Sequence, residues 1–165
     1  MRFLIIVFVS LILFSPAYAG WEGKFRCGSC GYESEALRVD CGTHSCYSVL
    51  YCDACKDFYS VLVSYDEAVI RKEYKPADAD KTIKEFKKNL VKPLNEVFSE
   101  EAERKIKLFS CPRCGATATE MPAQLTRENT CSSASASREE KNNSFIRCPK
   151  CGNKTLCFFH TAKWD

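Results

Sequence analysis

Four Cys-x-x-Cys pairs account for eight of the twelve cysteines in this 165-residue chain. Two residues between the sulfurs allow a tight turn, or knuckle, that points both thiolates at one metal ion. Two knuckles together supply the four sulfur ligands that zinc prefers in tetrahedral structural sites. The spacing therefore predicts about two zinc ions per chain, held by Cys27, Cys30, Cys52, Cys55, Cys111, Cys114, Cys148 and Cys151.

The knuckles at 111–115 and 148–152 carry turn chemistry in addition to spacing. They read Cys-Pro-Arg-Cys-Gly and Cys-Pro-Lys-Cys-Gly. Proline fixes φ in the turn, and the glycine that follows can adopt positive φ and let its amide approach a thiolate. The two earlier knuckles, at 27–30 and 52–55, are less regular, because Lys56 stands where a glycine would be usual. We expect the two earlier knuckles to form one site and the two later knuckles to form the other.

These segments resemble zinc ribbons, which are small β-hairpin modules that hold one metal ion between two knuckles. The resemblance covers residues 24–66 and 108–162 and implies an α+β protein with two zinc-ribbon modules. The gap between the two later knuckles exceeds the usual spacing of roughly 15–20 residues. We interpret its serine-rich part, residues 132–144, as a loop inserted in the hairpin. The segments Cys30–Tyr32 and Cys148–Gly152 also resemble the knuckles of rubredoxin, in which iron replaces zinc.

The first 19 residues are typical of a cleavable export signal. Arg2 precedes an apolar run over residues 3–14, which is followed by Pro16 and the small-residue triplet Ala-Tyr-Ala at 17–19. The run is shorter than the roughly 18 apolar residues that a spanning helix needs, and no later stretch is long or apolar enough. We therefore expect a secreted or periplasmic protein without a transmembrane span after cleavage, and the choice between periplasm and extracellular space stays open.

Four cysteines lie outside the knuckles, at Cys41, Cys46, Cys131 and Cys157. An exported chain favours disulfides over free thiols. Cys41 and Cys46 flank a short polar loop whose ends can meet across a hairpin, and Cys131 can tie the later hairpin to Cys157 in the last strand. Mixed pairings such as Cys41 with Cys131, and four buried free thiols, are the alternatives.

The strands that position the knuckles are predicted from β-branched and aromatic runs. In the first module, residues 20–75, we expect strands near 24–26, 35–39, 47–51 and 58–65, the last with Tyr59, Val61, Val63 and Tyr65 toward the core. In the second module, residues 108–165, we expect strands near 107–110, 116–121, 145–147 and 154–161.

A helical connector is predicted between the modules, over residues 76–107. Pro93 interrupts it, so we expect a kink or two helices, about 81–91 and 93–106, capped at Asp80 or Thr82. Its apolar residues recur at helical spacing at Ile83, Phe86, Leu90, Leu94, Val97 and Phe98. A solvated face explains the lysines most simply, and contact with an anionic surface is the alternative, made by Lys81, Lys84, Lys87, Lys88 and Lys92.

Closed sets of four cysteines leave no open coordination position for zinc catalysis. We expect His44 and His160 to be exposed rather than ligands. After cleavage the net charge falls from +3 to +2, since Arg2 is removed, and such a balance argues against nucleic acid. We expect an unidentified protein partner. We favour a non-catalytic binding or assembly module and leave enzymatic activity open. A thiol-disulfide oxidoreductase that uses a Cys-x-x-Cys pair and a rubredoxin-like iron electron carrier are the alternatives.

Overall fold

A computed structural model of the chain describes residues 19–99, 104–121, 131 and 147–164. The predicted export signal, the serine-rich insertion and most of the strand expected at 145–147 lie outside these ranges. Within them, no helix is long and apolar enough to cross a membrane. The elements in chain order are β1 (Gly20–Cys27), β2 (Leu37–Cys41), β3 (Ser45–Cys52), β4 (Asp57–Tyr65), α2 (Glu67–Glu73), α3 (Pro76–Asn89), β5 (Asn95–Ser99), β6 (Arg104–Ser110), β7 (Thr117–Glu120) and β8 (Leu156–Trp164).

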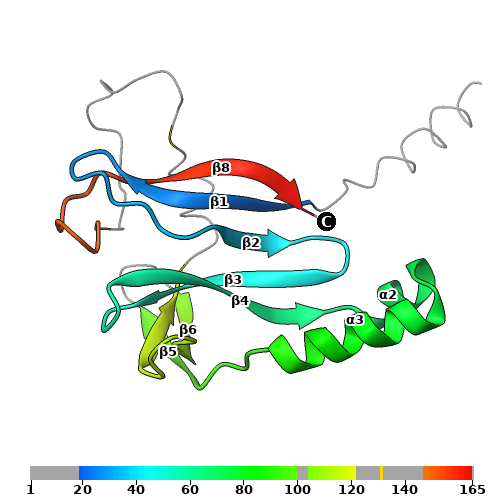
Figure 1. Cartoon of the computed structure of the whole chain (residues 1–165). Helices are drawn as coiled ribbons and strands as arrows, with labels where there is room; N and C mark the ends of the chain where they lie inside the picture. The colour runs from blue at the N-terminus through cyan, green and yellow to red at the C-terminus, as the bar shows by residue number, and fades with distance from the viewer. Residues whose placement is uncertain (1–18, 100–103, 122–130, 132–146, 165) are drawn as a thin grey trace, which may run out of the picture.

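The strands form one antiparallel arrangement in the order β5-β6-β7-β3-β2-β1-β8, and β4 pairs with the other edge of β3. The first and last strands lie side by side, because β1 pairs with β8 along its whole length. Strand β3 pairs with β4 along one edge, and with β2 and β7 along the other. The fold is therefore α+β, and strands from both ends of the sequence share one sheet (Figure 1).

Aromatic and aliphatic side chains fill two clusters between the strands. Phe25 contacts Phe58 and Phe158, with ring centroids 4.4 Å and 5.2 Å apart, and Cys27 and Cys148 belong to the same cluster. The second cluster contains Leu50, Phe109 and Ala118 together with Cys52 and Cys111. Each cluster thus includes sulfurs from two knuckles, so the metal-ligating residues are part of the core.

Strand β4 is buried on both of its faces. Val61 lies on the face that the sequence assigned to the core, but Phe58 and Leu62, on the opposite face, are equally buried. A register shift between Cys46 and Tyr47 of β3 alters the alternation along β4. The expectation of a single core-facing side was therefore wrong, because β4 packs against both clusters rather than against one.

The helices form a pair at one end of the β3–β4 hairpin. Asp66 caps α2 by accepting hydrogen bonds from two backbone amides of the first turn. Helix α3 begins at Pro76, in its first turn, and ends at Asn89. Ile70, Ala79 and Ile83 are buried between the helices.

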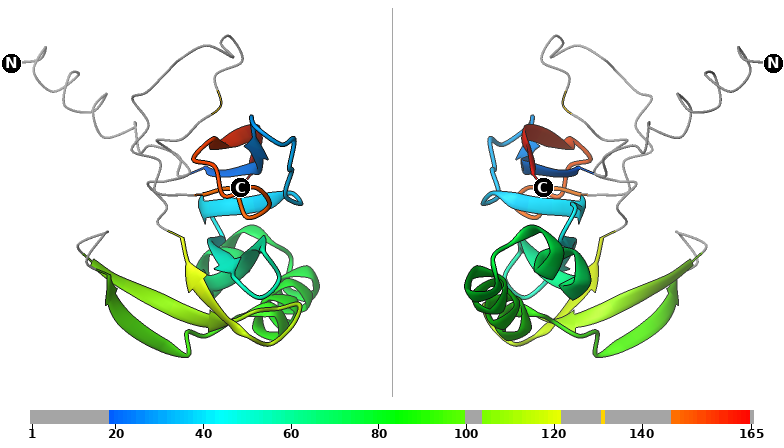
Figure 2. Two further views of the ribbon diagram at one scale, coloured as in Figure 1. Left: turned by 90° about the vertical axis from the view of Figure 1, so that its left-hand side faces the viewer. Right: turned by 90° about the vertical axis from the view of Figure 1, so that its right-hand side faces the viewer.

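The second predicted helix, over 93–106, is wrong. Residues 95–99 and 104–110 are strands β5 and β6, which pair through contacts such as Val97 with Ile106. Pro93 ends the helical pattern, and the apolar residues beyond it also fit an antiparallel hairpin. This hairpin extends away from the other strands (Figure 2).

The predicted helix start was also wrong. Because α3 begins earlier, Asp80 and Thr82 lie inside the helix and do not cap it. Helices α2 and α3 follow β4 and lead the chain to β5. Tyr65 packs on Phe86 of α3, with ring centroids 5.6 Å apart.

Candidate metal centres

The eight knuckle cysteines form two groups of four. Within each group the four sulfurs lie within 4.8 Å of one another. We name the groups centre A, which contains Cys27, Cys30, Cys148 and Cys151, and centre B, which contains Cys52, Cys55, Cys111 and Cys114.

The pairing of knuckles expected from their order in the chain is wrong. The first knuckle joins the fourth, and the second joins the third, so centre B is nested between the two halves of centre A. Strand pairing causes this arrangement. Cys27 lies opposite Leu156 where β1 pairs with β8, and the pairing of β3 with β7 places the 52–55 knuckle beside the 111–114 knuckle.

The sulfur separations fit a tetrahedral metal ion. In centre A, Cys27 and Cys151 are 3.6 Å apart, as are Cys30 and Cys148. In centre B the corresponding separations are 3.7 Å and 3.8 Å. Four sulfurs that each lie about 2.3 Å from a central zinc ion are about 3.8 Å apart in a regular tetrahedron. A disulfide requires about 2.05 Å, so these cysteines are arranged as ligands and not as disulfides.

The four knuckles share one turn geometry. In three of them a glycine follows the second sulfur with positive φ, at Gly31, Gly115 and Gly152, and in the fourth Lys56 adopts φ 53°. The backbone N–H of each of these glycines donates to the carbonyl of the first cysteine in its knuckle, over 2.8–3.1 Å. The departure at Lys56 therefore changes the residue type and not the turn.

Hydrogen bonds favour one thiolate of centre A in particular. Burial opposes ionisation of Cys27, but hydrogen bonds from the Thr155 hydroxyl and from backbone N–H groups lower the pKa of its thiol to about 6. The hydroxyl of Thr155 lies 3.2 Å from the Cys27 sulfur and is itself bonded to Ser29. Cys30 has the opposite tendency: although a backbone N–H of Tyr32 favours its thiolate, burial and the neighbouring sulfurs raise its pKa to about 12.

In centre B, hydrogen bonds favour the thiolate of Cys111. Burial opposes ionisation of Cys111, yet backbone N–H groups and neighbouring sulfurs lower its pKa to about 7. Burial and the Cys55 sulfur raise the pKa of the Tyr59 hydroxyl to about 12. The Arg113 guanidinium lies beside this hydroxyl and the Cys55 sulfur. This guanidinium offsets part of the negative charge of four thiolates around a divalent ion.

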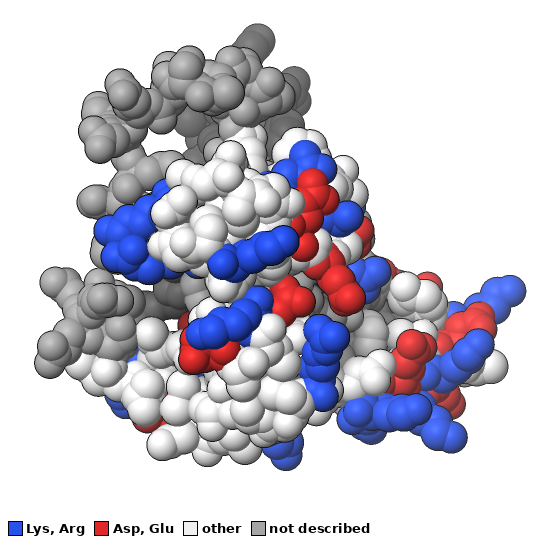
Figure 3. Space-filling view, turned by 60° about the vertical axis from the view of Figure 1, so that its left-hand side comes forward, with Lys and Arg blue, Asp and Glu red and all other residues white. Residues whose placement is uncertain are grey.

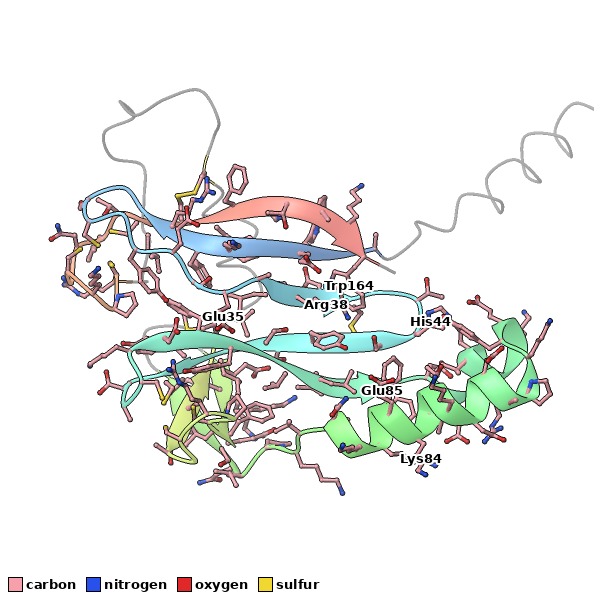
Figure 4. All side chains as sticks on the ribbon, viewed as in Figure 1. Glu35, Arg38, His44, Lys84, Glu85 and Trp164 are labelled. Carbon is pink, nitrogen blue, oxygen red and sulfur yellow. A yellow bond between two sulfur atoms is a disulfide. The ribbon has the colours of Figure 1, made fainter. Side chains whose placement is uncertain are left out.

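Both centres are closed on the protein side. In each, two sulfur-bearing residues are buried, one is half-buried and one, Cys114 or Cys151, is exposed. Four cysteines complete the coordination shell of zinc, so the arrangement can hold a metal ion and leaves no position for a substrate. The sulfurs of the two centres lie at the end of the sheet that is opposite the helices (Figure 4).

The four remaining cysteines form two disulfides. Cys41 bonds Cys46 across the β2–β3 hairpin, and Cys131 bonds Cys157 of β8. These are the two bridges proposed from the sequence, and neither mixed pairs nor free thiols occur at these positions.

The two histidines are partly buried, so the expectation that they are exposed was wrong. His44 bonds Glu73 over 2.6 Å and packs on Tyr74. His160 lies against Trp21 and Phe158, and burial lowers its pKa. Neither histidine belongs to a group of possible metal ligands in the described part of the chain.

Sequence reasoning missed the residues that support the sulfurs. Thr155 contacts centre A, and Tyr59 and Arg113 contact centre B. Tyr32 donates a hydrogen bond to the carboxylate of Asp57, and burial together with that carboxylate raises the tyrosine pKa. Tyr32 and Asp57 each lie two residues after a knuckle, which is the one local signal that could have identified them.

No protein-family model, curated protein or solved structure significantly matches this chain.

Proposed function

We propose that this chain is an exported zinc-binding protein whose two four-cysteine centres are structural, and that it serves as a non-catalytic binding or assembly module. The tetrahedral spacing of two complete sets of four sulfurs carries this proposal. The two parts of the sheet around centres A and B are then zinc ribbons whose knuckles come from nested positions in the chain. Metal and disulfides supplement the core of a small exported protein.

Metal counting tests the central claim. The native mass of the purified chain should show about two zinc ions, and the protein should be colourless. Chelation should unfold it, because the metal-binding free energy of such sites is largely folding free energy. A chain that binds no metal and has all twelve cysteines in disulfides would overturn the proposal.

Thiol counting tests the two disulfides independently. After denaturation and metal removal without a reductant, the eight knuckle cysteines should alkylate. The four cysteines of the two disulfides should be protected. Twelve reactive thiols would contradict this assignment.

A rubredoxin-like iron carrier is the alternative that the same geometry supports, since iron also takes four cysteine sulfurs. A visible absorption spectrum typical of iron-thiolate would favour it. An oxidoreductase is less compatible with the geometry, because thiolates bound to a metal are not free to attack a disulfide.

The β5–β6 hairpin is our candidate for the partner-binding surface. Leu94 and Phe98 are 63% and 67% exposed, and Val97 is 40% exposed. Exposed apolar side chains at a sheet edge are typical of interaction surfaces. A photoreactive residue at Phe98 should crosslink one protein in the native compartment, whereas the same residue at the exposed Tyr74 should not. Identical products at both positions would contradict a specific surface.

The lysines of α3 are a second, weaker candidate surface. Lys81, Lys84 and Lys88 are exposed, but Lys87 lies 3.5 Å from Glu67. Basic and acidic side chains are interspersed on the face in Figure 3. We therefore favour a protein partner over an anionic surface.

Export is tested at the amino terminus of the mature protein. Cleavage after Ala19 predicts that the protein recovered from the periplasm or medium begins at Gly20. Recovery of the full-length chain in the cytoplasm alone would contradict export.

A further inference from the structure

Tyr32 belongs to the knuckle turn of centre A through its backbone. Its carbonyl accepts the N–H of Cys27 over 2.9 Å, and its own N–H bonds the sulfur of Cys30. Any displacement of this backbone therefore moves two of the four sulfurs of centre A.

The side chain of Tyr32 reaches the segment that follows a knuckle of centre B. Its hydroxyl donates to Asp57, which follows the Lys56 turn of centre B and also accepts the N–H of Phe58 over 2.9 Å. Phe58 in turn packs on Phe25 of β1, with ring centroids 4.4 Å apart. Tyr32 of the centre A knuckle is thus in direct contact with Asp57, which pairs with Cys52 of centre B between β3 and β4.

We propose that the two centres bind metal cooperatively and that the hydrogen bond from Tyr32 to Asp57 links them. This inference rests on the proposed function, in which both centres hold metal. A metal ion at either centre orders its own knuckles and with them this shared contact. The second ion then binds a chain that is already partly ordered, which gives positive cooperativity.

The nested order of the knuckles acts in the same direction. Centre A joins cysteines from the two ends of the sequence, and all of centre B lies between them. Folding around centre B shortens the free loop that centre A must close, and a shorter loop has a smaller entropic penalty. By linkage, centre A must strengthen centre B by the same factor.

Native mass spectrometry of the full mature chain at half-loading with zinc tests this directly. Two independent, equal sites give about half of the molecules with one ion, and unequal sites give more than half. Cooperativity lowers the one-ion population below the value calculated for independent sites from the affinities of the two single-centre variants, and we expect a population well below half. A population equal to that calculated value would overturn the inference. Failure to bind any zinc would instead overturn the proposed function.

Tyr32→Phe keeps the ring and removes the linking hydroxyl. We expect it to reduce the cooperativity factor by about tenfold, as for loss of a hydrogen bond to a charged group, and so to raise the one-ion population. Tyr47→Phe is the matched control, because Tyr47 is also half-buried but packs on Trp164. Wild-type populations in Tyr32→Phe, or an equal change in both variants, would overturn the assignment to Tyr32.

Cobalt binding to single-centre variants supplies a second measurement. Cys114→Ser removes a ligand of centre B, and Cys151→Ser removes a ligand of centre A. Each remaining centre should bind cobalt more weakly than in the intact chain, and by the same factor. Unchanged affinity in both variants would overturn the inference even if both fold.

Discussion

At the residue scale, three of the four knuckles place a glycine at the position of positive φ. Gly115 has φ +74°, and a Cβ placed there would meet no atom within 4 Å. The penalty for Gly115→Ala is therefore conformational, about 1 kcal/mol of unfolding free energy. Chemical denaturation of the zinc-loaded protein measures it.

Lys56 provides the control for this prediction. It already adopts φ 53°, so Lys56→Gly relieves strain in the folded state but adds freedom to the unfolded chain. These effects oppose each other, and we expect a net change within about 0.5 kcal/mol. A loss as large as that of Gly115→Ala would show that Lys56 has another role.

The lowered thiol pKa values predict metal release on acidification. The pKa is about 6 for Cys27 and about 7 for Cys111. Stabilisation of a thiolate with a lowered pKa is complete above the ordinary thiol pKa and is lost as pH falls through the lowered value. Metal affinity falls in the same direction because protons compete for the sulfurs. Both centres should therefore lose their ions as the pH is lowered.

The single-centre variants allow release from each centre to be measured. Cobalt-thiolate absorption of Cys151→Ser reports centre B alone, and that of Cys114→Ser reports centre A alone. Absorption that does not fall on acidification would contradict the prediction.

At the element scale, the Cys41–Cys46 loop anchors the helices. The carbonyl of His44 accepts the N–H of Asp66 over 2.8 Å, and its ring contacts Glu73 and Tyr74 at the end of α2. Loss of the Cys41–Cys46 disulfide should lower the free energy of unfolding of this loop and the adjacent helices by about 2 kcal/mol. We expect faster amide hydrogen exchange in α2 and α3 in the double variant with Cys41→Ser and Cys46→Ser.

Removal of the other disulfide is the control for that experiment. The double variant with Cys131→Ser and Cys157→Ser should leave exchange in α2 and α3 unchanged, since this bridge joins β8. Equal acceleration in both variants would mean that the effect is global and not transmitted through the His44 loop.

The sequence predicts those helices and strands whose residue pattern lies within one short segment. Strands β2, β3 and β4 and helix α3 overlap the ranges expected from β-branched or helical patterns. The β5–β6 hairpin was missed, because Leu94, Val97 and Phe98 fit the helical spacing of the preceding residues and Pro93 permits more than one continuation. The pairing of β5 with β6, for example of Val97 with Ile106, decides between them.

At the scale of the whole molecule, each knuckle is readable from its spacing but its partner is not. The turn needs only two sulfurs and a residue with positive φ. The choice of partner depends on β1 pairing with β8 and β3 with β7, which are contacts between distant segments. Four knuckles permit three pairings, and proximity in the chain favours the one that the structure does not have.

Double substitutions distinguish the nested pairing from the sequential one by metal count alone. If Cys30 and Cys151 share a centre, the double variant with Cys30→Ser and Cys151→Ser disrupts one centre and should retain one zinc ion at saturating metal. The double variant with Cys30→Ser and Cys55→Ser disrupts both centres and should retain none. Sequential pairing predicts the reverse result, because Cys30 and Cys55 would then belong to one site. Native mass, measured with each single variant as a control for folding, decides between the two topologies, since loss of one ligand in either knuckle should remove the same ion.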